Sequence, residues 1–151
     1  MINFDIQKPF IESIDQARLT HVIQTTLQVE KIFGEIELSL VVGDDEQIRA
    51  LNLEYLGNDT PTDVLSFPSD ELDPDTGLRY IGDIILSHPR ATEQAALSGH
   101  STTAEIELLV VHAVLHLLGY DHAEPGEKVQ MWAVQNSILN QLGTPLQVFP
   151  E

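Results

Sequence analysis

The chain has 151 residues, of which 42% are hydrophobic, so it is long enough to bury one sizeable core and too short to divide comfortably into two domains. Its 24 acidic residues outnumber its 7 basic residues and give a net charge of −17, so the average surface repels nucleic-acid phosphate. The absence of cysteine excludes disulfides and thiolate metal sites, which leaves histidine nitrogen and carboxylate oxygen as metal ligands.

The N-terminal residues MINFDIQKPFIES carry acids and lack the basic and apolar zones of a secretion signal. No uninterrupted apolar run approaches the roughly 20 residues that a membrane-spanning helix needs. We therefore expect a cytoplasmic protein that makes no membrane contact, with residues 1–151 forming a single domain.

The first part of the chain alternates strand and helix patterns. Residues 2–7 alternate apolar and polar side chains, which predicts a strand with one buried face. Residues 11–33 place apolar side chains at helical spacing, and Gly34 is expected to close that helix. A second strand at 36–43 and a helix at 44–56, led by acids, follow.

The third strand, 62–67, and the fourth, 81–87, are joined by residues 68–80. The Asp, Pro and Gly content of this connection predicts a surface loop or a wide hairpin. Its acids lack the order of ligands and glycine that an EF-hand requires, so we expect a solvated loop and no calcium site.

The remainder of the chain is predicted to be helical. Ser87 or His88 is expected to cap a short helix that ends at Gly99. Residues 102–119 form a helix that is apolar nearly all round, and residues 127–142 form the last helix. Four strands and five helices, with strands early and helices late, predict an α+β fold in which helices pack over one small mixed sheet and the apolar helix is central.

Three of the six histidines lie in HAVLHLLGYDH, residues 112–122. His112 and His116 are four residues apart, which places them about 40° apart on one face of a helix and about one turn apart along its axis. Gly119 sits where a helix commonly ends in a left-handed residue, so the chain can turn back and bring His122 to the same ion. The spacing predicts a metal site with three histidine ligands.

Three neutral imidazoles leave the fourth tetrahedral position for water, which is the arrangement of catalytic zinc sites. Bound water then has its pKa lowered to about 7, and this favours a hydrolase. One zinc ion per chain is the expected cofactor, although imidazole ligands also suit nickel, copper and iron.

Other polar residues near this motif have several interpretations. Asp121 can orient an imidazole or accept a proton from the bound water, or it can bond to backbone amides in the turn, and both interpretations stay open. Glu105 lies about 10 Å up the helix axis from His112 and fits a capping box formed by residues 102–105. Structural roles are also expected for His21, His88, His100, Thr62, Asp63 and Ser66.

The pattern HxxxHxxGxxH has the spacing of the metzincin peptidases, whose full form is HExxHxxGxxH with glutamate as the general base. Ala113 stands in the place of that glutamate, so the base is missing. Met131, nine residues past His122, can imitate the methionine turn of those enzymes, but packing in the core of the last helix is the favoured interpretation.

The same stretch resembles the YbeY-type endoribonucleases, also called rRNA maturation factors, whose signature is similar to HGxLHLxGYDH. HAVLHLLGYDH matches every specified position except that Ala113 replaces glycine. The resemblance extends through LNLEYLGNDTPTDVLSFP and IGDIILS to Met131, and it covers roughly residues 36–140 in matching order.

The resemblance implies a single α+β domain that binds zinc through three histidines, here His112, His116 and His122. It also implies cleavage of single-stranded RNA, maturation of the 3′ end of the small-subunit ribosomal RNA, and ribosome quality control. The implied partners are ribosomal RNA, the small ribosomal subunit and an Era-type GTPase.

One departure concerns a basic residue. Where the resembling family has arginine after the aromatic residue of the LN segment, this chain has Leu56 after Tyr55. Leucine supplies no charge for a phosphate or a transition state. Arg49, Arg79 or Arg90 can compensate, and otherwise the ribosome or a protein partner is expected to help position the RNA.

We therefore predict a zinc-dependent endoribonuclease in which metal-activated water attacks the RNA phosphodiester. Two alternatives remain open. One is a zinc peptidase with another base in place of the absent glutamate. The other is a noncatalytic ribosome-assembly factor in which structural zinc joins a helix to a loop.

Overall fold

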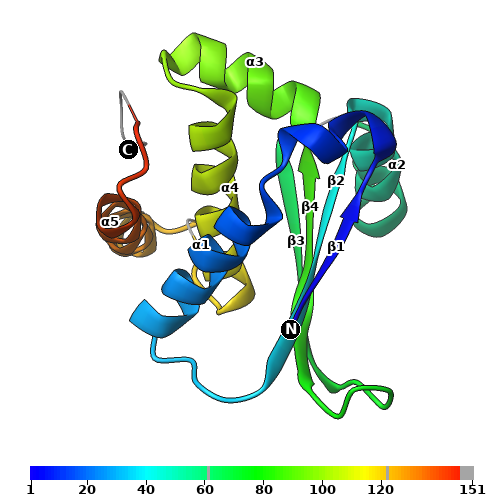
Figure 1. Ribbon diagram of the computed structural model, residues 1–151, viewed down its shortest axis with the longest axis vertical. Coiled ribbons are helices and arrows are strands. Elements are labelled where there is room, and N and C mark those ends of the chain that lie inside the picture. The colour runs from blue at the N-terminus through cyan, green and yellow to red at the C-terminus, as the bar shows by residue number, and fades with distance from the viewer. Residues whose placement is uncertain (61, 122, 147–151) are drawn as a thin grey trace.

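A computed structural model of the chain describes residues 1–60, 62–121 and 123–146. Its centre is a four-stranded sheet that carries helices on both faces (Figure 1). The strands lie in the order β1-β2-β4-β3, where β1, β2 and β4 are parallel and β3 is antiparallel to β4. Their bounds are β1 (Ile2–Ile6), β2 (Ile36–Gly43), β3 (Val64–Leu72) and β4 (Arg79–Ser87).

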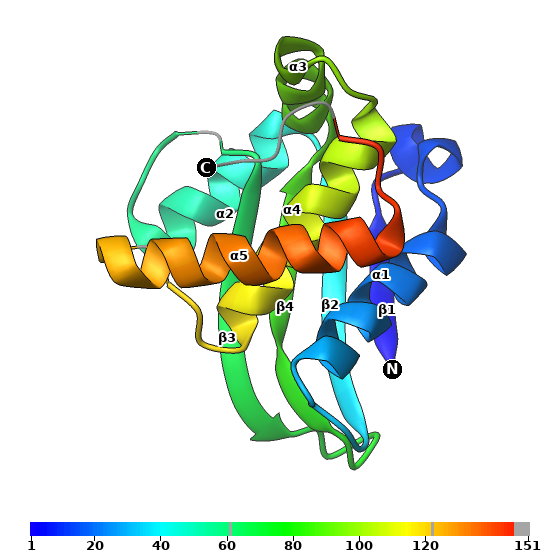
Figure 2. The ribbon, with the colours of Figure 1, turned by 90° about the vertical axis from the view of Figure 1, so that its left-hand side faces the viewer.

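The described residues also form five α-helices and a short 3₁₀ helix, which confirms the predicted α+β class with a mixed sheet. Helix α2 covers one face of the sheet, whereas α1, α4 and α5 lie on the other face and α3 crosses one end (Figure 1). Figure 2 shows α5 crossing over α4 on the outer side. The helices are η1 (Lys8–Ser13), α1 (Gln16–Val29), α2 (Asp45–Leu56), α3 (His88–Ser98), α4 (Thr102–Leu117) and α5 (Pro125–Leu142).

The helix expected at 11–33 is shorter than predicted. Its start is occupied by the separate turn η1, and α1 begins only at Gln16 because the Asp15 carboxylate accepts the backbone N–H of Arg18 at 3.0 Å. The helix ends at Val29, and Lys31 then adopts a left-handed φ of 59°.

The connection at 68–80 is a hairpin, which was one of its two predicted forms. Both strands extend into it, so only residues 73–78 of this connection lie outside β3 and β4. Pro68 is tolerated because β3 is an edge strand, and the register shifts between Pro68 and Glu71.

The main core lies between the sheet and helices α1, α4 and α5. Helix α4 is buried along most of its length, as its apolar sequence predicted. It lies so close to the sheet that a Cβ on Gly82 of β4 would be 2.7 Å from a methyl carbon of Leu117. A second, smaller core of Ile48, Leu65 and Ile85 fills the space under α2.

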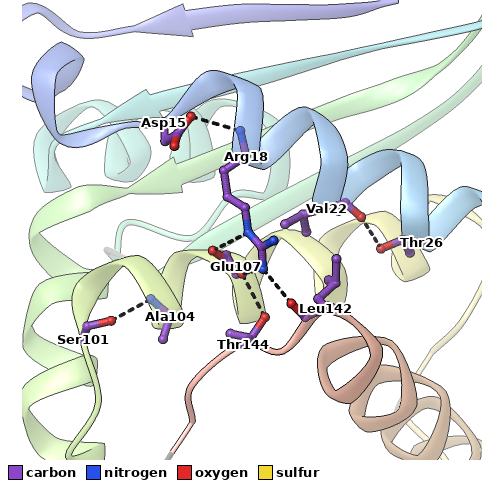
Figure 3. A network of polar contacts seen from close by, with 9 residues as sticks. All are labelled: Asp15, Arg18, Val22, Thr26, Ser101, Ala104, Glu107, Leu142 and Thr144. Carbon is purple, nitrogen blue, oxygen red and sulfur yellow. Dashed lines mark hydrogen bonds and ion pairs between the residues drawn. The ribbon is translucent and has the colours of Figure 1, made fainter.

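A partly buried ion pair joins α1, α4 and the end of α5 (Figure 3). Arg18 donates from Nε and Nη2 to the Glu107 carboxylate at 3.1 and 2.9 Å, and also to the carbonyl oxygen of Leu142 at 3.0 Å. The Thr144 hydroxyl donates to the same carboxylate at 2.8 Å. The hydrogen bond and charge of Glu107 raise the pKa of Arg18. Together, the bonds of this cluster fix α4 between its two neighbouring helices.

None of the helices in the described part of the chain combines the length and the apolar character that crossing a membrane requires.

Candidate metal centre

The side chains of His112 and His116 meet on one face of α4. Their Nε2 atoms lie 3.1 Å apart, and the centroids of the two rings are 4.6 Å apart with the planes at 76°. The four-residue spacing thus gives the convergence that the sequence predicted. Two ligands at about 2.0–2.1 Å from one tetrahedral zinc ion lie roughly 3.3 Å from each other, so this pair fits zinc.

Gln135 of α5 holds the ring of His112 from the other side. Its Oε1 lies 2.9 Å from Nδ1 of His112, and the residue is 1% exposed. Because an amide oxygen only accepts, the proton of a neutral His112 belongs on Nδ1 and its Nε2 presents a lone pair. Such a partner fixes both the tautomer and the orientation of a metal-binding imidazole.

Sequence reasoning missed Gln135. It lies 23 residues after His112, and its partner becomes visible only when α5 crosses α4 (Figure 2). A polar residue on the buried face of the last helix was the available signal, because a buried amide needs a hydrogen-bond partner.

The predicted third ligand, His122, lies outside the described residues. Within the described ranges, no group of three His, Asp or Glu side chains is placed to hold a metal ion. The turn that leads to His122 does have its expected form, since Gly119 has a φ of 103° and the N–H of Tyr120 donates to the carbonyl of Leu115 at 3.0 Å.

Asp121, next to the predicted ligand, is exposed and lines a shallow pocket of about 350 Å³ together with Glu127 and Gln130. Its proposed part in orienting an imidazole or accepting a proton stays a prediction. Tyr120 lines the same pocket, and a hydrogen bond with the Glu30 carboxylate raises the pKa of the Tyr120 hydroxyl to about 12, so this hydroxyl stays protonated at neutral pH.

A cavity of about 220 Å³ lies beside His112. It is open to solvent on one side and is lined by side chains from α3, α4, α5, the start of β3 and the residue before it, and the polar ones are Asp63, Gln94, Glu105, His112, Trp132 and Gln135. Asp63, to which the sequence assigned only a turn role, is therefore part of the surroundings of the predicted metal ligand.

The capping box predicted at 102–105 is wrong. Ser101 is the residue that caps α4, by accepting the N–H of Ala104 at 3.1 Å. Glu105 instead directs its carboxylate to Nε2 of His100 at 2.5 Å, and both side chains are buried. His100 keeps the structural role expected of it, with a carboxylate as its partner.

The metzincin interpretation loses support from Ala113. This residue is fully buried, and its carbonyl oxygen accepts the Ser66 hydroxyl at 3.4 Å. Met131 is also fully buried, as its predicted role in the core requires.

The arginines proposed to compensate for Leu56 are all engaged with carboxylates. Arg49 donates to Asp59 at 2.7 and 3.3 Å, Arg79 donates to Asp70 at 2.7 Å, and Arg90 lies 3.7 Å from Asp45. Leu56 itself is 54% exposed at the end of α2. An RNA phosphate would have to compete with these carboxylates for each guanidinium.

The remaining histidines lie away from the pair. His88 stacks on Phe10 with ring centroids 4.7 Å apart, and burial lowers its pKa. His21 lines a separate cleft of about 870 Å³ between the end of α1 and the ends of β1 and β2. Thr62 donates to Asp63 at 3.4 Å, in keeping with the expected turn role.

The chain matches a family model described as "Endoribonuclease YbeY" over residues 2–143. Among curated proteins with that same description, it is similar to one from Roseiflexus sp. (strain RS-1), with 39% identity over 94% of this chain and 92% of the relative. A relative from Brevibacillus brevis is 39% identical over 95% of this chain and 98% of its own length.

The fold also has a solved counterpart. A solution structure of a Thermotoga maritima protein superimposes with a TM-score of 0.61 and 26% identity, and the match covers 94% of this chain and 89% of that one.

Proposed function

Because the chain belongs to the YbeY endoribonuclease family of hydrolases, we propose that it is a zinc-dependent endoribonuclease that cleaves single-stranded RNA during maturation of the small-subunit ribosomal RNA 3′ end. The observation that carries the metal part of this proposal is the pair of Nε2 atoms 3.1 Å apart, one of them on an imidazole oriented by Gln135. The family is one of metalloenzymes, and the donor set of this chain agrees with that.

His112, His116 and the predicted ligand His122 would hold the zinc ion. A zinc ion in such a site supplies a Lewis acid that lowers the pKa of water and stabilises negative charge on a phosphodiester. The protein's own contribution is positional. Helix α4 is fixed in the core, and Gln135 holds the proton of His112 on Nδ1, away from the substrate side.

Ribosomal RNA and the small ribosomal subunit are the proposed partners, with an Era-type GTPase as a further one, and the cytoplasm is the proposed location. The net charge of −17 and the arginine–carboxylate pairs support a role for such partners, because the isolated surface offers little attraction for RNA.

The first test is elemental analysis of the purified wild-type protein and of His116→Ala, with cleavage of a single-stranded ribosomal RNA fragment measured on the same samples. We expect about one zinc ion per wild-type chain, and loss of both zinc and cleavage in the variant. His21→Ala is the matched control, because this histidine lies in a separate cleft and should leave both properties unchanged.

Stoichiometric zinc without RNA cleavage, either alone or with small ribosomal subunits, would contradict the nuclease and favour the noncatalytic assembly factor. Hydrolysis of peptides but not RNA would select the peptidase.

A further inference from the structure

Two residues of α5, Trp132 and Lys128, have no role in the metal centre proposed above. Trp132 lines the cavity of about 220 Å³ that His112 also lines. One turn earlier, the ammonium group of Lys128 lies 4.4 Å from the centroid of the Trp132 ring. An aromatic ring that lines the cavity and a cation thus stand together on α5.

Lys128 differs from the arginines in that its charge is not paired with a carboxylate in the described part of the chain. Arg18, Arg49, Arg79 and Arg90 each pair with a carboxylate. Within the described ranges, Lys128 makes no ion pair with a carboxylate, and its side chain is exposed. A phosphate that binds Lys128 therefore does not have to compete with a carboxylate for the ammonium group.

The interior of the cavity has the opposite character. Asp63 and Glu105 both line it, so their carboxylates oppose the entry of a phosphate group. A nucleobase is neutral and planar, and it can stack on an indole ring while its edge bonds to polar side chains such as Gln94. The volume is below the roughly 300–1,000 Å³ of pockets for drug-sized ligands, which suits one base better than several.

We propose that Trp132 and Lys128 form a nucleotide-binding subsite of the RNA, in which one base stacks on Trp132 inside the cavity and an adjacent phosphate binds Lys128 on the same helix. This inference rests on the proposed function, because it takes single-stranded RNA as the substrate of the neighbouring histidine centre. It places the missing basic contact on α5, and not at Leu56 of α2.

The experiment uses the fluorescence of Trp132, which is the single tryptophan of the chain. The probe is a short 2′-O-methyl RNA oligonucleotide, which lacks a free 2′-hydroxyl, titrated into the zinc-loaded protein. Stacking should change the Trp132 emission in a saturable way. The anisotropy of a dye on the oligonucleotide should give the same dissociation constant.

Variants separate the two contacts. Trp132→Ala should weaken binding by about 5- to 150-fold, the loss expected for one stacked base, whereas Trp132→Phe should recover most of the affinity. Log affinity falls as log salt concentration rises, and Lys128→Ala should make this slope less steep by about 0.7, the value for one phosphate of a single strand. Lys31→Ala removes the same charge beyond the end of α1 and should leave the slope unchanged.

For RNA cleavage, both subsite variants should raise KM more than they lower kcat. Oligonucleotide binding that leaves Trp132 emission unchanged and survives Trp132→Ala would overturn the subsite, even if cleavage is intact. Binding with the expected emission change but no RNA cleavage would instead overturn the proposed reaction and leave the subsite standing.

Discussion

Helix α4 carries two partly buried polar clusters that differ in how their hydrogen bonds are arranged. Around Glu107, donors from Arg18 and Thr144 converge on one carboxylate, so acceptor and donors match (Figure 3). Around His112, two ring nitrogens approach each other at 3.1 Å, a distance that a shared cation explains well. The first arrangement is suited to holding helices together, and the second is suited to binding a ligand.

The largest effect that would test this contrast is on activity. In His116→Ala we expect RNA cleavage to fall by more than about 100-fold, because loss of a metal ligand should exceed the loss of an outer partner. The free energy of unfolding of the zinc-free variant, measured in urea, should nevertheless lie within about 1 kcal/mol of that of the zinc-free wild type, because His116 is only half-buried. A large loss of stability in zinc-free His116→Ala would mean that this cluster is also structural.

Arg18→Ala should show the reverse pattern. It leaves the Glu107 carboxylate, whose side chain is 5% exposed, without its cation, and we expect a loss of about 3 kcal/mol in the free energy of unfolding. The expected loss is at the low end of the range for breaking buried ion pairs, because the Arg18 side chain is 32% exposed. Zinc content and cleavage per folded molecule should stay unchanged.

A matched variant makes the Arg18 prediction sharper. The double substitution of Arg18→Met with Glu107→Leu removes both charges, so it should recover much of the stability lost in Arg18→Ala. If the double variant is no more stable than Arg18→Ala, the loss arises from packing of the arginine stem and not from an unpaired carboxylate.

The sequence predicted one of these clusters better than the other. His112 and His116 are four residues apart, so helical geometry alone brings them together. Arg18 and Glu107 are 89 residues apart, and their pairing depends on how α1 packs on α4, which no local pattern reveals. The same reason hid Gln135, which reaches His112 only through the crossing of two helices.

Local errors in the predicted fold have local causes. The prediction of one helix at 11–33 did not take Asp15 into account. Asp15 caps α1 by accepting the N–H of Arg18, and an aspartate inside the apolar pattern was a signal for this helix start. The strand β3 continues through Pro68 because an edge position does not need its N–H, and edge positions depend on strand order, which the pattern left open.

An intermediate effect is expected at Gln135, which belongs to the histidine cluster but would not touch the metal. Gln135→Leu should weaken zinc binding by about 10- to 100-fold, measured by competition with a chelator of known affinity. Gln135→Glu keeps an acceptor for the His112 Nδ1 proton and should retain tight binding. Equal losses in both variants would show that an acceptor for the His112 Nδ1 proton is not what Gln135 contributes to zinc binding.

The smallest effect concerns a histidine outside both clusters. Burial lowers the pKa of His88 below its ordinary value of 6.5, so the unfolded chain binds a proton at a higher pH than the folded chain does. Its contribution to stability is therefore fully present above about pH 6.5 and is lost as the pH falls through that value and below. His88→Phe, which can keep the stacking on Phe10, should lose less stability than the wild type between pH 7.5 and 5.5 in urea unfolding of the zinc-free protein. An unchanged pH dependence would show that protonation of His88 does not cause the loss of stability in acid.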